Sequence, residues 1–192
     1  MRALFAGLVV VLGLVVFAIS FTFFGERDQQ QAQQFGVPFE LVDHNGNQIT
    51  DAAFRGQPTA IFFGFTRCPE ICPTTVFELE AWFAELGEDG ENIDAYFITV
   101  DPERDTPEAL EFYLTSITDR VVGITGDPAA VRAMVDGFSV YYKRVELDDG
   151  DYTMDHTASV FLLDSDGDFR KSIAYGERMD TAVAKLRDLA DT

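Results

Sequence analysis

One apolar run of strand length, residues 59–65, constrains the fold of this chain most strongly, because two cysteines follow it directly. The run reads TAIFFGF, which is typical of a strand that is covered on both faces. Cys68 and Cys72 are the only cysteines, and they stand between this run and a segment with apolar residues at helical spacing. The sequence therefore predicts a buried strand, a loop that carries two sulfurs, and a helix.

Two frames for the start of that helix stay open at this stage. Thr75 and Glu78 could form a capping box, or Pro73 could be the first helical residue, with Cys72 as the cap. Either frame places a sulfur at or within one turn of a helix N-terminus, where unpaired amides and the helix dipole favour the thiolate.

Strands and helices alternate along the rest of the chain. The expected strands cover residues 96–100, 121–124, 159–163 and 169–174. The expected helices cover residues 107–113, 128–136 and 178–189, and Asn45-Gly46 predicts an early hairpin. A parallel half, an antiparallel half and a cysteine pair after the first core strand predict an α/β, thioredoxin-like fold with a mixed sheet flanked by helices.

Charge and hydropathy divide the chain into three parts. Residues 3–24 contain no charged side chain, and a helix of that length crosses roughly 30 Å of hydrocarbon. We therefore expect a retained N-terminal membrane anchor at 1–24, a glutamine-rich polar linker at 25–36, and one domain at 37–192. Arg2 precedes the apolar segment, which favours a cytoplasmic amino terminus and an exported domain.

The chain is strongly acidic. It has 14 Lys and Arg against 33 Asp and Glu, for a net charge of −19, and every charged residue except Arg2 follows residue 24. Such a surface repels nucleic acid and anionic lipid headgroups. We expect no nucleic-acid partner.

Four interpretations of the cysteine pair compete. A structural disulfide would close a very short loop and so remove little entropy from the unfolded chain. A thioredoxin-type exchanger has two residues between its cysteines, whereas this chain has three. Residues 71–75 resemble the active segment of peroxiredoxins, but Pro69 stands where those enzymes keep a threonine. The fourth interpretation is a metal site.

A metal site needs a further soft or borderline ligand, and the chain has only two histidines. His44 falls in the predicted hairpin turn and is expected to be a bystander. His156 directly precedes a core strand, at a junction that can face the cysteine loop in a thioredoxin-like sheet. Two thiolates and an imidazole suit Cu(I), with zinc as the second candidate. Met154 is either a weak additional ligand or a side chain that fills a gap.

Three separated motifs resemble, in order, the signatures of the Sco/SenC family. They are GFTRCPEICP at 64–73, VDPERDTP at 100–107 and DHT at 155–157. This resemblance implies a membrane-anchored copper chaperone that serves the binuclear copper centre of cytochrome c oxidase subunit II. It also implies that Cys68, Cys72 and His156 bind copper as Cu(I), with Cu(II) as a second oxidation state, and that no residue is catalytic.

The resemblance further implies a domain on the periplasmic or intermembrane-space side of the membrane. Its expected partners are subunit II, an upstream copper donor and an exported thioredoxin-like reductant, because a disulfide between the cysteines cannot bind copper. The alternative function is a thiol-disulfide oxidoreductase that reduces the copper-ligand cysteines of the target. In that case Cys68 and Cys72 are the redox-active residues.

Several other residues belong to these motifs or stand out by their charge. Asp101 and Asp105 belong to the second motif and either support the site or form a turn before the next helix. Arg67 stands where the family often has a histidine, and its charge should favour the thiolates. Residues 164–168 are rich in aspartate but lack the spacing of a calcium loop, so a hairpin turn is expected.

Overall fold

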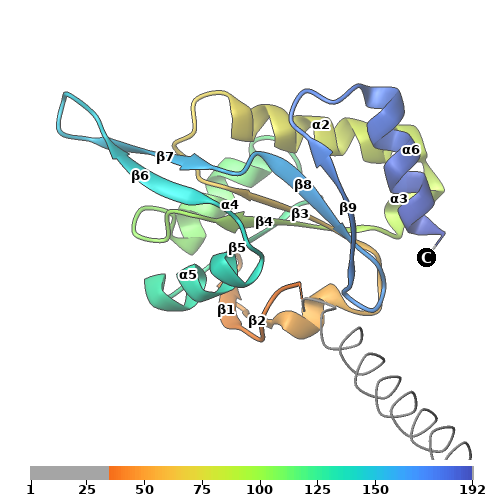
Figure 1. Cartoon of the computed structure of the whole chain (residues 1–192), viewed down its shortest axis with the longest axis horizontal. Coiled ribbons are helices and arrows are strands. Elements are labelled where there is room, and N and C mark those ends of the chain that lie inside the picture. The colour runs from red at the N-terminus through yellow and green to blue at the C-terminus, as the bar shows by residue number, and fades with distance from the viewer. Residues whose placement is uncertain (1–34, 192) are drawn as a thin grey trace, which may run out of the picture. The chain divides into compact units, whose positions relative to one another are not determined.

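A seven-stranded mixed sheet runs through the domain, in the order β2-β1-β5-β4-β3-β8-β9 (Figure 1). This computed structural model describes residues 35–191 of the chain. The three central strands are parallel to one another: β3 (Thr59–Gly64), β4 (Asp94–Thr99) and β5 (Val122–Thr125). The four outer strands pair antiparallel: β1 (Glu40–Asp43), β2 (Gln48–Thr50), β8 (Ser159–Leu163) and β9 (Phe169–Ala174). The predicted mixed sheet is confirmed.

Helices flank the strands of the sheet, and the two short ones, at residues 51–54 and 88–91, were not predicted from the sequence. They are η1 (Asp51–Phe54), α2 (Ile71–Leu86), α3 (Glu88–Glu91), α4 (Pro107–Thr115), α5 (Pro128–Gly137) and α6 (Met179–Ala190). Side chains cap two of these helices, since the Thr106 hydroxyl accepts from the amide of Ala109, and Asp127 accepts from two amides of α5. Helices α4 and α5 therefore begin where a side chain satisfies free amides.

The two faces of the sheet are covered by different helices. Phe63 of β3 packs on Phe138 at the end of α5, whereas its neighbour Phe62 packs on Phe97. Phe97 in turn contacts Tyr113 of α4. Because neighbouring side chains of a strand point to opposite faces, α4 and α5 lie on opposite sides of β3. The buried strand predicted at 59–65 is confirmed, and all six residues of β3 are buried.

A second, two-stranded sheet was also not predicted from the sequence. It consists of β6 (Tyr142–Glu146) and β7 (Tyr152–His156), which pair with each other and project from the body of the domain at the upper left of Figure 1. The expected junction at residues 155–157 is thus the end of a strand. Asp149-Gly150 is a hairpin signal that would have indicated it.

The predicted anchor, residues 1–24, and most of the predicted linker, 25–36, lie outside the described residues. Between residues 35 and 191, no helix combines the length and the apolar character needed to cross a membrane. The described chain opens at Phe35, whose ring packs on Phe138, Phe161 and Phe169.

Candidate metal centre

The cysteine loop leads from the end of β3 into the first turn of α2. The amide of Cys68 bonds to the carbonyl of Phe65, and the helix begins at Ile71. Both predicted frames for the helix start are wrong, because the Thr75 hydroxyl donates to the carbonyl of Ile71 inside the helix, and Cys72 is already helical. A sulfur was nevertheless expected within one turn of the helix N-terminus, and the Cys72 sulfur lies there.

Gly64, the last residue of β3, makes room for the second sulfur. A Cβ atom at this position would lie 3.0 Å from the Cys72 Sγ and 2.8 Å from the ring of Phe97. A Cβ contact of 2.8 Å essentially never occurs and one of 3.0 Å is tighter than most, so any larger residue would displace the ring and crowd the sulfur. The absence of a side chain at Gly64 therefore fixes Cys72 against the end of the sheet.

Three potential ligand atoms converge at this point. One atom each from Cys68, Cys72 and His156 lies within 4.8 Å of the other two. The Cys72 Sγ is 3.5 Å from the His156 Nε2, and the amide of Cys72 donates to the Cys68 Sγ at 3.4 Å. Both cysteines are free thiols, Cys72 fully buried and Cys68 half-buried. The arrangement can hold one soft metal ion and exposes it on the Cys68 side.

The imidazole of His156 is oriented by its other nitrogen. Nδ1 lies 3.0 Å from the carbonyl oxygen of Thr157, and because a carbonyl only accepts, Nδ1 carries the hydrogen. Nε2 is therefore the nitrogen available to a metal, as in many metal-binding histidines. The rings of Phe62 and Phe65 meet the imidazole edge to face, with centroids 6.1 and 5.8 Å away.

The two thiols have opposite acidities. The pKa of Cys68 is lowered to about 4, first by the hydrogen bond from the Cys72 thiol and also by backbone amides at the start of α2. The pKa of Cys72 is raised, because its proton is held in that same hydrogen bond and because the thiol is buried. Near neutral pH the pair therefore holds one proton and one negative charge, and the charge sits on the more accessible sulfur.

The other candidate residues lie in different places. His44 is outside this cluster, and its Nδ1 accepts from the amide of Gly123 at 2.8 Å, which fastens the first hairpin to β5. Met154 lines a cavity of about 440 Å³ together with Cys68 and His156. Arg67 reaches the Asp151 carboxylate at 3.5 Å, so its guanidinium is engaged with the β6–β7 hairpin.

Both aspartates of the second motif are buried and accept hydrogen bonds. Asp105 accepts from the amide and the hydroxyl of Thr66, and Asp101 accepts from the hydroxyl of Tyr152. The expected turn and helix start are also present. Thr66 and Tyr152 were missed in the sequence analysis, since a lone threonine or tyrosine gives no signal of a partner far along the chain.

Residues 164–168 form the expected hairpin turn, with Asp164 accepting from two amides within it.

A thioredoxin-like sheet with two thiols and an imidazole at the end of its central strand defines the class of soft-metal-binding thioredoxin-fold proteins. The model of the SCO1/SenC family matches residues 27–191. This chain belongs to the SCO1/SenC family, as the motifs predict.

Known relatives agree with this assignment. The SCO2-like protein of Rickettsia prowazekii is 38% identical over 140 residues, which cover 72% of this chain and 68% of that protein. The mitochondrial SCO1 homologue of Mus musculus is 39% identical over 140 residues, which cover 70% of this chain and 48% of that protein.

Solved structures with copper bound are similar to this domain. ScoI of Bradyrhizobium japonicum has 43% sequence identity and a TM-score of 0.75, with 81% of this chain and 99% of that chain covered. ScoI of Arabidopsis thaliana has 30% identity and a TM-score of 0.76, with 82% and 98% covered. Copper, rather than zinc, is thus the metal bound in these two similar proteins.

Proposed function

We propose that this protein binds one copper ion through Cys68, Cys72 and His156 and carries it as cargo to a client protein. The observation that carries the proposal is the convergence of these three ligand atoms within 4.8 Å. Two thiolates and one imidazole form a soft, low-coordinate set that suits Cu(I). The copper-bound structures of similar proteins support the choice of metal.

Loading requires little rearrangement of the protein. Cys68 is the thiolate of the pair, and the Nε2 of His156 faces the sulfurs. Cys72 gives up its proton when copper binds, because a thiolate and not a thiol is the metal ligand. We therefore expect loading to release about one proton per copper at neutral pH.

Unloading should begin at Cys68. Cys72 is fully buried, whereas Cys68 is half-buried and lines the cavity beside the site. An incoming thiolate or imidazole of a client can reach copper from that side and displace Cys68 first. Transfer is then a stepwise exchange of ligands, with no net oxidation or reduction.

We propose subunit II of cytochrome c oxidase as the client and its binuclear copper centre as the destination. Membership of the SCO1/SenC family supports this assignment. The test is to replace the chromosomal gene with a Cys68→Ala, Cys72→Ala or His156→Ala variant and to measure copper in purified subunit II. Copper-deficient subunit II in all three strains, corrected by the parent gene, is the expected result.

We further propose the membrane arrangement given by the sequence. Residues 1–24 anchor the protein, residues 25–36 link the anchor to the domain, and residues 37–192 face the periplasm or the intermembrane space. The 22 uncharged residues at 3–24 support this proposal. Alkali extraction of membranes, followed by protease treatment of intact spheroplasts, tests the anchor and the side on which the domain lies.

A thiol-disulfide oxidoreductase is the second candidate, and the low pKa of Cys68 favours it. In that reaction the Cys68 thiolate attacks a client disulfide and releases one client thiolate, and Cys72 then resolves the mixed disulfide and leaves the chain oxidised. The contact between His156 and Cys72 is the observation that favours metal binding instead. A His156→Ala variant should retain the exchange rate and lose tight copper binding.

A further inference from the structure

The strand that carries His156 is not hydrogen-bonded to the main sheet. Within the described residues, β7 pairs with β6, and these two strands form a sheet of their own. The cysteines, in contrast, follow β3 at the centre of the seven-stranded sheet. β8, which begins three residues after His156, pairs with β3 and so brings the end of β7 near the cysteine loop. Side-chain contacts hold the rest of β7, and these contacts can refine the position of the imidazole.

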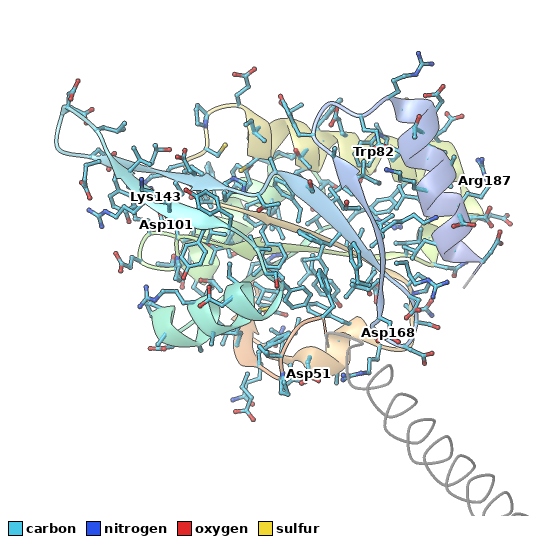
Figure 2. All side chains as sticks on the ribbon, in the orientation of Figure 1. Asp51, Trp82, Asp101, Lys143, Asp168 and Arg187 are labelled. Atoms are coloured by element: carbon cyan, nitrogen blue, oxygen red, sulfur yellow. The ribbon has the colours of Figure 1, made fainter. Side chains whose placement is uncertain are left out.

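Tyr152, at the opposite end of β7, fastens this strand to the body of the domain. Its hydroxyl donates to the Asp101 carboxylate at 2.8 Å, and the carbonyl of Tyr152 accepts from Arg104 at 2.9 Å. Arg104 also pairs with Asp101, and its guanidinium lies 3.5 Å from the centre of the Tyr152 ring. Figure 2 labels Asp101 beside the β6–β7 hairpin.

The cysteine loop is fastened in a similar way. Thr66 precedes Cys68 by two residues, and its amide and hydroxyl donate to the Asp105 carboxylate at 3.1 and 2.6 Å. Asp105 is fully buried, and this burial raises its pKa, while the bonds from Thr66 and Thr99 oppose the rise. The loop is thus held by a carboxylate that water does not reach.

Both attachments lie on the same short segment after β4. The Thr99 hydroxyl donates to Asp105 at 2.6 Å and accepts from the amide of Asp101 at 2.8 Å. The chain of contacts therefore runs from Tyr152 through Asp101, Thr99 and Asp105 to Thr66. Residues 99–105 contact the histidine strand at one end and the cysteine loop at the other.

We propose that residues 99–105 set the geometry of the metal centre, with Tyr152 positioning His156 and Thr66 positioning the two cysteines. This inference rests on the proposed copper site and adds to it residues that never touch the metal. Because the contacts of Tyr152 and of Thr66 lead to different ligands, the effects of removing them are separable. Removal of the Tyr152 hydroxyl should weaken copper binding only through His156. Removal of the Thr66 hydroxyl should weaken copper binding through the cysteines, and therefore also when His156 is absent.

The first test is the Tyr152→Phe variant of the full chain in detergent, in the parent and in a His156→Ala background. Anaerobic competition for Cu(I) with a chromophoric chelator gives the affinity, and X-ray absorption gives the nitrogen contribution. In the parent we expect a loss of about 10–100-fold, as for other residues that orient ligands, together with a weaker nitrogen signal. In the His156→Ala background we expect no further loss. An equal loss in both backgrounds, or none in the parent, overturns the inference.

The second test is the Thr66→Val variant, which removes the hydroxyl and keeps the size of the side chain. We expect its affinity to fall by a similar factor in both backgrounds, because it acts on the cysteines. The matched controls are Tyr175→Phe and Thr115→Val, whose side chains lie outside this chain of contacts, and both should bind copper like the parent. A loss confined to the parent background would contradict the assignment of Thr66 to the cysteines.

A measurement without copper separates this inference from the proposed function. His44 and His156 are the only histidines, so the ring signals of His44 serve as an internal reference in NMR spectra of the reduced protein. Tyr152→Phe should shift the His156 signals and leave those of His44 in place. Unmoved His156 signals would overturn the positioning role, whereas a parent that binds no Cu(I) but shows the shift would overturn only the proposed copper function.

Discussion

The charge distribution between the two sulfurs determines how this site reacts. Cys68 combines accessibility with a low pKa, whereas Cys72 keeps its proton and is buried. The sequence predicted a thiolate near a helix N-terminus, but it did not distinguish the two cysteines. That distinction depends first on the hydrogen bond between the two thiols and then on the burial of Cys72 against Gly64 and the sheet.

Alkylation of Cys68 should show this low pKa directly. Because thiolate is the reactive form, the rate with iodoacetamide should stay nearly constant from about pH 8 down to about pH 5, where an ordinary thiol has almost stopped reacting. Peptide mapping by mass spectrometry identifies the modified residue. In a Cys72→Ala variant the hydrogen bond from the Cys72 thiol is lost, so the rate should begin to fall at a higher pH than in the parent. A rate in the parent that already halves near pH 8 would contradict the assignment.

Gly64 offers a test of close packing at the site. Gly64→Ala should lower the free energy of unfolding by about 1–3 kcal/mol through overpacking, and it should also weaken copper binding, since the new methyl group contacts the Cys72 sulfur. Gly123→Ala is the control, because its methyl group would lie 2.8 Å from Leu114, away from the sulfurs. Urea unfolding and Cu(I) competition measure the two quantities. Equal copper affinity in both variants would argue against the packing role of Gly64.

At the scale of elements, apolar periodicity and capping residues predicted most of the fold. Strands β3, β4, β5, β8 and β9 and helices α2, α4, α5 and α6 lie within a few residues of their expected positions. The β6–β7 hairpin was missed because its strands carry exposed charged residues and lack a buried face. The proximity of His156 to the cysteines was nevertheless predicted, because the chain has only two histidines.

Helix α5 allows a test of stability that is independent of the site. Asp127→Ala removes a side chain that accepts from the amides of Ala129 and Ala130 at 2.9 and 3.1 Å. The loss of such a cap costs about 1 kcal/mol, so the midpoint of urea unfolding should decrease. Copper affinity should not change, because α5 does not contribute a ligand. A copper affinity that falls along with stability would show that the site responds to general loosening of the domain.

At the scale of the whole molecule, the excess of carboxylates sets the response to salt. The net charge of −19 produces repulsion within the folded state. Raising NaCl from about 20 to about 200 mM shortens the Debye length to below about 10 Å. The melting temperature of the apo domain, residues 35–192, should therefore rise. The expected rise is about 2–4 °C for each kcal/mol that salt adds to the free energy of unfolding. A melting temperature that falls with salt would mean that attractive ion pairs outweigh this repulsion.

The most direct test of the central claim is an anaerobic Cu(I) titration of the reduced protein, with Cys68→Ala, Cys72→Ala and His156→Ala variants in parallel. We predict one tightly bound copper per chain in the parent and a loss of tight binding in both cysteine variants. In His156→Ala we predict a loss greater than the 10–100-fold typical of residues beyond the ligands. A His156→Ala variant that binds copper as tightly as the parent, or a reduced parent without tight copper, would contradict the three-ligand site.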